Sequence, residues 1–210
     1  MSDSVATTGS TKRTRKPVQT RSATRMAKVV EAAERLLEDV GPEKVSIPAI
    51  AEISGVPRAA IYPFFPDKYA LFSHIAKHHM EGMIEALIDA KIDPEWDWKG
   101  CVQRLIETVA DYYNQHPAAS ILLLRGALAD GDKEAFLAKN QAISALLRAK
   151  MKALGALSGL PESPDAAVLS AEIAFACMKH GYAMEETVSP TICQEAVHAT
   201  QAYLARWEGT

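Results

Sequence analysis

The sequence has few of the features that mark exported or membrane-embedded proteins. Its three cysteines, Cys101, Cys177 and Cys193, are too few and too scattered for a disulfide framework. No segment contains 18 consecutive apolar residues, so we expect no membrane-spanning helix. The first 25 residues are rich in Ser, Thr, Lys and Arg and hold no apolar secretory core. These absences favour a protein of the reducing cytoplasm.

Motifs that carry catalysis or bind metal ions are also missing. There is no CxxC pair and no HExxH, and Cys177 and His180, which share a helix face, would have to converge with Cys193 and His198 to bind zinc. No Gly-rich phosphate loop follows a strand, and no Gly-x-Ser-x-Gly elbow occurs. No stretch shows strand alternation. We therefore expect an all-α protein with no catalytic residues, no metal site and no cofactor.

The net charge of −3 conceals an uneven distribution along the chain. Residues 12–68 hold 11 basic and 7 acidic residues, whereas residues 69–210 hold 12 basic and 18 acidic residues. A basic front and an acidic rear indicate that only the front meets a polyanion. Residues 1–23 have almost no large apolar side chains, so we expect a disordered basic arm that solubilises the chain or contacts phosphate.

Apolar residues at three- and four-residue spacing predict about nine helices with short connections. The first is expected over residues 24–40, where Gly41-Pro42 stops it. Ser46 is expected to cap the second helix, and Asp67 to cap a long one over about residues 68–89.

The second half of the chain is predicted to be helical as well. Residues 98–115 are strongly amphipathic, and Ile121–Leu124 is apolar all round, as in a buried helix. Another helix is expected over residues 136–154. The last two helices are each expected to begin with an N-cap serine followed by proline, at Ser163-Pro164 and Ser189-Pro190.

Residues 46–68 are the most informative stretch. A short helix is followed by a turn at Gly55 and by a second short segment that carries Arg58 and Tyr62. Two short helices joined by a Gly-containing turn form a helix-turn-helix, whose second helix enters the DNA major groove. Pro63 and Pro66 limit that second helix to two turns or fewer.

This stretch and its flanks resemble the DNA-binding domain of the TetR family of transcriptional regulators. The resemblance covers about residues 24–72 and rests on the order and spacing of Ala32-Ala33, Gly41, Ile50-Ala51, Gly55-Val56, Ile61-Tyr62, Phe65, Lys68 and Leu71. It implies a basic arm over residues 1–23, an N-terminal three-helix DNA-binding domain over residues 24–70, and a helical effector-binding and dimerisation domain over residues 71–210.

The resemblance also implies roles for single residues. Arg58 would reach a phosphate or a guanine edge, Tyr62 a phosphate or a base edge, and Lys68 a phosphate near its helix N-terminus. This chain departs from the family pattern at three positions. Pro57 stands where the family usually has a capping Ser or Thr, and Pro63 and Phe64 stand where it often has residues that touch DNA. Pro63 cannot hydrogen-bond a base, whereas Phe64 can offer an apolar contact. The expected DNA-binding residues are Ser46, Pro48, Pro57, Arg58, Ala59, Tyr62, Phe64 and Lys68.

Small residues mark the last two helices. Alanines recur there at helical spacing, which lets helices approach closely and favours a two-fold, four-helix dimer interface. The alternative is that these alanines pack within one subunit. The predicted interface residues are Ala167, Ala171, Ala174, Tyr182, Ala196, Ala199, Ala202 and Tyr203.

A pocket between the helices of the second domain is predicted to have mostly apolar walls with a few polar groups, which favours a lipophilic ligand. Its expected residues are His79, Met83, Leu105, Thr108, Tyr112, Asn140, Ile143, Glu172, Phe175 and Met178. For each polar member, a role inside the packed core is the alternative.

Together these features predict a homodimeric, one-component transcriptional regulator. We expect a repressor that a small lipophilic effector, unknown from the sequence, releases from a palindromic operator in double-stranded DNA. Two alternatives stay open: a ligand-independent regulator or activator that uses its helical domain for dimerisation or a protein partner, and an all-α enzyme that retains a helix-turn-helix-like element.

Overall fold

The computed structural model describes residues 16–126 and 133–209. Over these two ranges the chain forms nine α-helices, one π-helical segment and one 3₁₀ turn, and no β-strand. The predicted all-α fold is therefore confirmed. None of the helices described is both long and apolar enough to cross a membrane.

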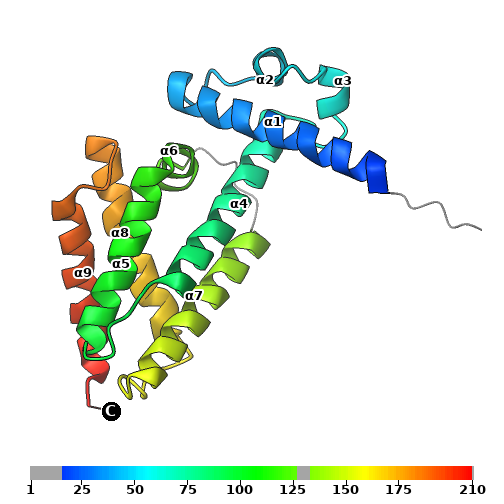
Figure 1. Ribbon diagram of the computed structural model, residues 1–210. Coiled ribbons are helices and arrows are strands. Elements are labelled where there is room, and N and C mark those ends of the chain that lie inside the picture. The colour runs from blue at the N-terminus through cyan, green and yellow to red at the C-terminus, as the bar shows by residue number, and fades with distance from the viewer. Residues whose placement is uncertain (1–15, 127–132, 210) are drawn as a thin grey trace, which may run out of the picture.

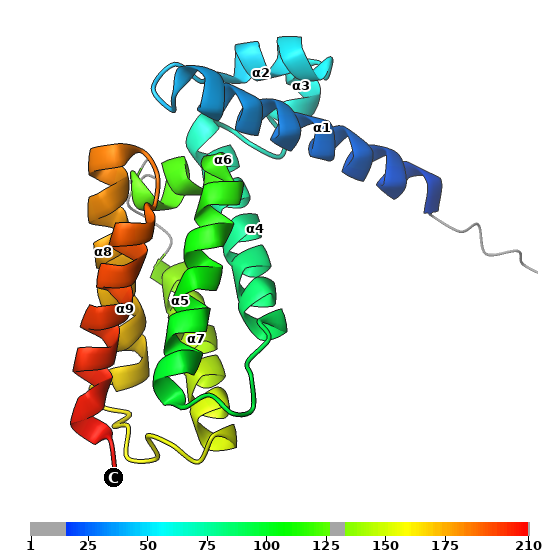
Figure 2. The same ribbon diagram turned by 60° about the vertical axis from the view of Figure 1, so that its left-hand side comes forward.

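The helices form two units that share α4 (Figure 1). The N-terminal unit consists of three helices and the start of α4, and the C-terminal bundle holds the rest of α4 and all later elements. The N-terminal unit contains α1 (Lys16–Val40), α2 (Ile47–Ser54), α3 (Arg58–Ile61) and the first turns of α4 (Lys68–Asp89). The bundle adds α5 (Trp98–Gln115), α6 (Pro117–Ala119), the π-helix (Ser120–Leu124), α7 (Lys133–Ala153), α8 (Ala166–Glu185), α9 (Pro190–Leu204) and the 3₁₀ turn Ala205–Trp207. Helices α8 and α9 lie side by side along one flank in both views (Figures 1 and 2).

Helix α1 begins at Lys16, so the expectation of a disordered arm up to residue 23 is wrong for residues 16–23. Pro17 stands in the first turn, where its missing N–H costs no helical hydrogen bond. Extending an existing helix needs no new nucleus, which favours this longer start. Residues 1–15 of the predicted arm lie outside the described residues.

Side-chain caps define the helix-turn-helix as predicted. Ser46 Oγ accepts a hydrogen bond from the Ala49 amide at 3.4 Å, and Asp67 Oδ1 accepts one from the Ala70 amide at 2.8 Å. Gly55 ends α2 with φ of +67°, a left-handed conformation that glycine adopts without strain. Helix α3 begins after Pro57, which provides no side-chain cap.

The prediction that Ser163-Pro164 begins a helix is wrong, because α8 starts at Ala166 with Asp165 as its N-cap. Asp165 Oδ1 accepts hydrogen bonds from the amides of Ala167 and Val168 at 3.0 and 3.3 Å. The matching prediction for Ser189 at the start of α9 is confirmed.

Tertiary contacts explain why Asp165 takes the capping position. Its carboxylate also accepts hydrogen bonds from Arg148 Nη2 at 2.8 Å and from Ser144 Oγ at 2.7 Å. Burial raises the pKa of Asp165, but hydrogen bonds from Ser144, Arg148 and the Val168 amide, with the charge of Arg148, outweigh this and lower it from its ordinary value of 3.8.

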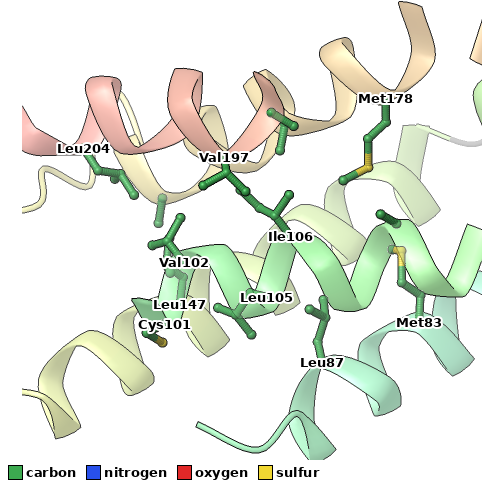
Figure 3. Packing of buried hydrophobic residues seen from close by; sticks show 14 of the residues in the cluster. Met83, Leu87, Cys101, Val102, Leu105, Ile106, Leu147, Met178, Val197 and Leu204 are labelled. Atoms are coloured by element: carbon green, nitrogen blue, oxygen red, sulfur yellow. The ribbon is translucent and has the colours of Figure 1, made fainter. Parts of the chain in front are cut away.

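Two hydrophobic cores hold the units together. The first packs Leu37, Ile50, Ile61 and Phe72, all with no exposed surface, inside the N-terminal unit. The second fills the bundle, and Figure 3 shows part of it, with side chains from α4, α5, α7, α8 and α9. The buried π-helix joins both: Ile121 and Leu122 belong to the first core and Leu124 to the second.

Candidate functional site

The first candidate site is the outer face of the helix-turn-helix, at the end of the molecule remote from the C-terminus (Figure 1). Ile61 is fully buried and anchors α3, so the short helix turns its other side outward. On that side Tyr62 and Phe64 are 46% and 54% exposed, although aromatic side chains usually lie inside. Of the other predicted DNA-binding residues, Pro57, Arg58 and Ala59 are exposed, and Ser46 and Pro48 are half-buried.

Lys68 has a structural contact in addition to its predicted contact with phosphate. Its Nζ donates hydrogen bonds to the carbonyl oxygens of Pro42 and Glu43 at 2.9 and 3.0 Å, which fixes the connection between α1 and α2. Its neighbour Tyr69 is 46% exposed and lies beneath the Lys68 ammonium, 5.5 Å from Nζ to the ring centroid. Tyr69 was not among the residues predicted at this face.

The second candidate site is a cavity inside the C-terminal bundle, between α4, α5, α7, α8 and α9. It opens to solvent, and its volume is about 770 Å³ when the space at its mouth is included. Six of the ten predicted ligand-binding residues line it: Met83, Leu105, Ile143, Glu172, Phe175 and Met178. Figure 3 shows Met83, Leu105 and Met178 in this interior.

Four of the alanines predicted at the dimer interface lie toward the interior of the subunit. Ala171 and Ala174 line the cavity, and Ala167 and Ala196 have no exposed surface within one subunit. Their positions agree with the alternative of packing within the subunit, because the inner faces of α8 and α9 lie against each other and against the cavity. The remaining predicted positions are half-buried or exposed: Tyr182, Ala199, Ala202 and Tyr203.

One charged pair stands at the mostly apolar wall of the cavity. Lys139 Nζ lies 3.5 Å from Glu172 Oε1 and 5.2 Å from the centroid of the Phe175 ring, and 12% of the Lys139 side chain is exposed. The hydroxyl-bearing residue Tyr113 also lines the cavity, and burial, followed by the charges of Tyr112 and Glu172, raises its pKa well above the ordinary value. Tyr113 therefore stays protonated and can act as a hydrogen-bond donor.

The four other predicted ligand-binding residues do not line the cavity. Thr108 Oγ1 donates to the Arg104 carbonyl at 2.8 Å within α5, and Asn140 is buried on α7. His79 and Tyr112 instead form a contact between the two units. Sequence reasoning missed other wall residues, among them Leu87, Val102, Ile106, Lys139, Ser170, Thr200 and Leu204.

The contact between the units centres on the buried His79. Its Nδ1 lies 3.1 Å from Tyr112 Oη on α5, and its Nε2 lies 3.2 Å from Glu34 Oε1 on α1, an approach too oblique for a hydrogen bond. His116 stacks on Tyr112 with ring centroids 4.1 Å apart. Burial, then the charges of Glu34 and Glu85, raise the pKa of Tyr112, so its hydroxyl keeps its proton. Helices α1, α4 and α5 thus meet in one polar cluster.

Comparisons with known proteins agree with this geometry. Residues 29–75 match the family model described as bacterial regulatory proteins, tetR family. No curated protein matches the sequence.

Within the parts of the chain that the structure describes, no group of three His, Cys, Asp or Glu side chains could hold a metal ion.

Solved structures with a similar fold cover nearly the whole chain. A TetR-family transcriptional regulator from Streptomyces coelicolor is 19% identical with a TM-score of 0.66, covering 87% of this chain and 98% of that one. A TetR transcriptional regulator from Rhodococcus sp. RHA1 is 17% identical with a TM-score of 0.63, covering 89% and 97%. The fatty acid degradation regulator FadR from Bacillus halodurans is 14% identical with a TM-score of 0.62, covering 86% and 94%.

Proposed function

We propose that this chain, which belongs to the TetR family through its N-terminal domain and has the fold of TetR-family regulators, is a cytoplasmic homodimeric repressor that a small lipophilic effector releases from a palindromic operator. The observation that carries the proposal is the arrangement along α4. The exposed helix-turn-helix lies at the start of this helix, and the apolar cavity lies beside Met83 and Leu87 near its end.

Sequence choice on DNA would rest on few side chains. The single turn of α3 presents Arg58, whose guanidinium can pair bidentately with a guanine or bind a phosphate. Tyr62 and Phe64 add aromatic contacts at the exposed end of this turn. Because so few polar groups face outward here, much of the affinity would come from phosphate contacts and DNA shape, which makes binding strongly salt-dependent.

The outer face of α8 supports the dimer. Leu169 and Met184 are 40% and 73% exposed, and Ile173 and Ala176 lie between them at helical spacing. Exposed apolar side chains that line up along one helix face often mark an interaction surface, so this stripe is suited to a partner. A second copy of the chain supplies one and provides the two-fold symmetry that a palindromic operator requires. The proposed interface is therefore the outer stripe of α8 with the neighbouring exposed residues of α9.

Effector release follows from linkage. An effector that prefers a different tilt of α4 lowers operator affinity by the ratio of its affinities for the two conformations. The apolar walls favour a lipophilic molecule, and the similar structure from Bacillus halodurans is that of a fatty acid degradation regulator. The cavity also argues against a ligand-independent regulator, for which a filled interior would be expected.

The decisive experiment is selection of bound duplexes from a random DNA pool with the full-length chain. We expect a palindrome whose half-sites lie one helical turn apart. Arg58→Ala should weaken binding to the recovered site by at least tenfold, since each dimer loses two contacts. Arg206→Ala, an exposed arginine at the opposite end, is the matched control and should bind normally. Failure to enrich any sequence would refute the proposal.

The dimer is tested separately by sedimentation velocity. Met184→Glu places a charge at the C-terminal end of the exposed stripe, on its most exposed apolar side chain, and we expect monomers that lose operator binding. Lys152→Glu, an exposed position at the end of α7, is the control and should leave the dimer intact. A Met184→Glu protein that remains dimeric would place the interface elsewhere.

A further inference from the structure

Thr200 is one of the residues that line the cavity, and its hydroxyl group is buried. It lies on the inner face of α9, is 3% exposed, and its Oγ1 has no hydrogen-bond partner among the described residues. Buried polar groups almost always have partners, and a threonine inside a helix commonly bonds to the carbonyl four residues earlier. Thr200 lacks even that local bond, so its position costs free energy in the protein alone.

Two other polar side chains at the cavity, Ser170 and Glu172, are already engaged. Ser170 Oγ donates to the Ala167 carbonyl at 2.8 Å, and the Glu172 carboxylate faces the Lys139 ammonium. The lysine and glutamate neutralise each other, so the cavity offers no net charge to a ligand. Thr200 is thus a neutral group, able to donate and accept, in a wall made largely of hydrocarbon.

We propose that Thr200 selects the effector, and that the effector is an uncharged, mostly hydrocarbon molecule whose hydroxyl or carbonyl oxygen hydrogen-bonds to Thr200 Oγ1. The proposal rests on the proposed function, in which the cavity holds the effector. A charged group at this position would lose its hydration without finding a counter-charge. A neutral oxygen instead pairs with a hydroxyl that is otherwise unsatisfied.

This arrangement would discriminate strongly between molecules of the same shape. An apolar wall distinguishes hydrocarbons weakly, because one methylene changes affinity little. A buried hydroxyl that stays unpaired penalises every ligand without a matching oxygen. Thr200 would therefore exclude plain hydrocarbons of suitable size while admitting alcohols, ketones or esters.

The test compares octan-1-ol with 1-chlorooctane, which has similar size but no hydroxyl group. Binding to the full-length dimer is measured by displacement of 1-anilinonaphthalene-8-sulfonate, confirmed for the alcohol by titration calorimetry. The variants are Thr200→Val, which keeps the shape, and Thr200→Ser, which keeps the hydroxyl. Thr108→Val is the matched control, since the Thr108 hydroxyl bonds within α5 and lies outside the cavity lining.

We expect the wild-type protein to bind octan-1-ol about tenfold more tightly than 1-chlorooctane. Thr200→Val should weaken octan-1-ol binding about tenfold and leave 1-chlorooctane unchanged or tighter, whereas Thr200→Ser and Thr108→Val should retain the preference. Thr200→Val should also raise the urea midpoint of the ligand-free protein, because it removes an unsatisfied buried hydroxyl.

Three results would overturn the role of Thr200. If both probes bind the wild type equally, the effector can still be lipophilic but Thr200 does not select it. If Thr200→Val weakens both probes alike, or if the preference for the alcohol survives in that variant, the oxygen is not recognised by Thr200. If neither probe binds the wild type, selection by Thr200 and effector release both fail, while the operator experiment with Arg58→Ala still decides DNA binding independently.

Discussion

Gly82 on α4 faces the hydroxyl group of Tyr112 so closely that only glycine fits there. A Cβ atom at this position would lie 2.7 Å from Tyr112 Oη and 3.5 Å from its Cζ. The tyrosine cannot easily move aside, since it stacks on His116 and its hydroxyl lies 3.1 Å from His79 Nδ1. Gly82→Ala therefore perturbs the contact between the two units without introducing a polar group.

The expected magnitude is the balance of two effects. Replacing glycine by alanine inside a helix stabilises it by about 0.5–1 kcal/mol. Displacing Tyr112 costs about 1–3 kcal/mol for overpacking and the loss of its hydrogen bond to His79. Gly82→Ala should thus destabilise the wild-type protein by about 1–2 kcal/mol. In a Tyr112→Phe background the nearest atom is the ring carbon at ordinary contact distance, so the same change should stabilise by about 0.5–1 kcal/mol.

The assay is urea unfolding of the wild type, both single variants and the double variant. All four are measured at one protein concentration, because the stability of a dimer depends on concentration. The reasoning requires the effect of Gly82→Ala to change sign between the two backgrounds. An equal effect in both would mean that the Tyr112 hydroxyl does not occupy the position beside Gly82, and the proposed polar cluster between the units would be wrong.

Three further substitutions and modifications have defined outcomes. Asp165→Ala should destabilise the protein by about 2 kcal/mol near neutral pH. Because the pKa of Asp165 is lowered in the folded state, this difference in stability should be complete above pH 3.8 and shrink as the pH falls below it. Urea unfolding of the wild type and the variant near neutral pH and below pH 3.8 tests this. Cys101 has no exposed surface, and burial raises the pKa of its thiol despite the opposing charge of Lys150, so Ellman's reagent should label it only after unfolding, and rapid labelling of the native protein would contradict its burial. Gly181→Ala would place a Cβ 2.5 Å from Ile192 Cγ1 and should lower the thermal midpoint. Adding Ile192→Ala should partly restore that midpoint, and a double variant with no recovery would refute the clash.

Local signals in the sequence were sufficient for most helix boundaries. The predicted bounds of α4 and α5 agree with the structure, because caps and proline positions act over a few residues. The start of α8 was missed because two residues able to cap it, Ser163 and Asp165, stand only two positions apart. Contacts with Arg148 and Ser144, which are distant in the sequence, hold Asp165 in the capping position. The π-helical turn depends on tertiary contacts as well: Ser120 Oγ donates to the Tyr113 carbonyl at 2.7 Å.

The interior of the bundle was harder to predict, for a reason visible in α8. Apolar residues are spread around this helix, so its sequence does not indicate whether the alanine face or the face with Leu169 and Met184 points inward. The small side chains of Ala171 and Ala174 were assigned to a dimer, yet in the structure they leave room for the cavity. His79 shows the same difficulty, because a polar residue on an apolar face can contact either a ligand or another helix.

The polar cluster and the cavity act on the same helix, which limits how strong the proposed switch has to be. Coupling between two sites typically amounts to about 1–3 kcal/mol, which is also the range for leaving one buried polar group unpaired. A tilt of α4 that separates His79 from Tyr112 would cost an amount of this size. The difference between the effector's binding free energies for the two states must therefore exceed the free energy lost when this contact breaks. Substitutions at His79 or Tyr112 would then shift the conformational equilibrium before any effector is present, while those at the cavity wall would change only the effector's affinity.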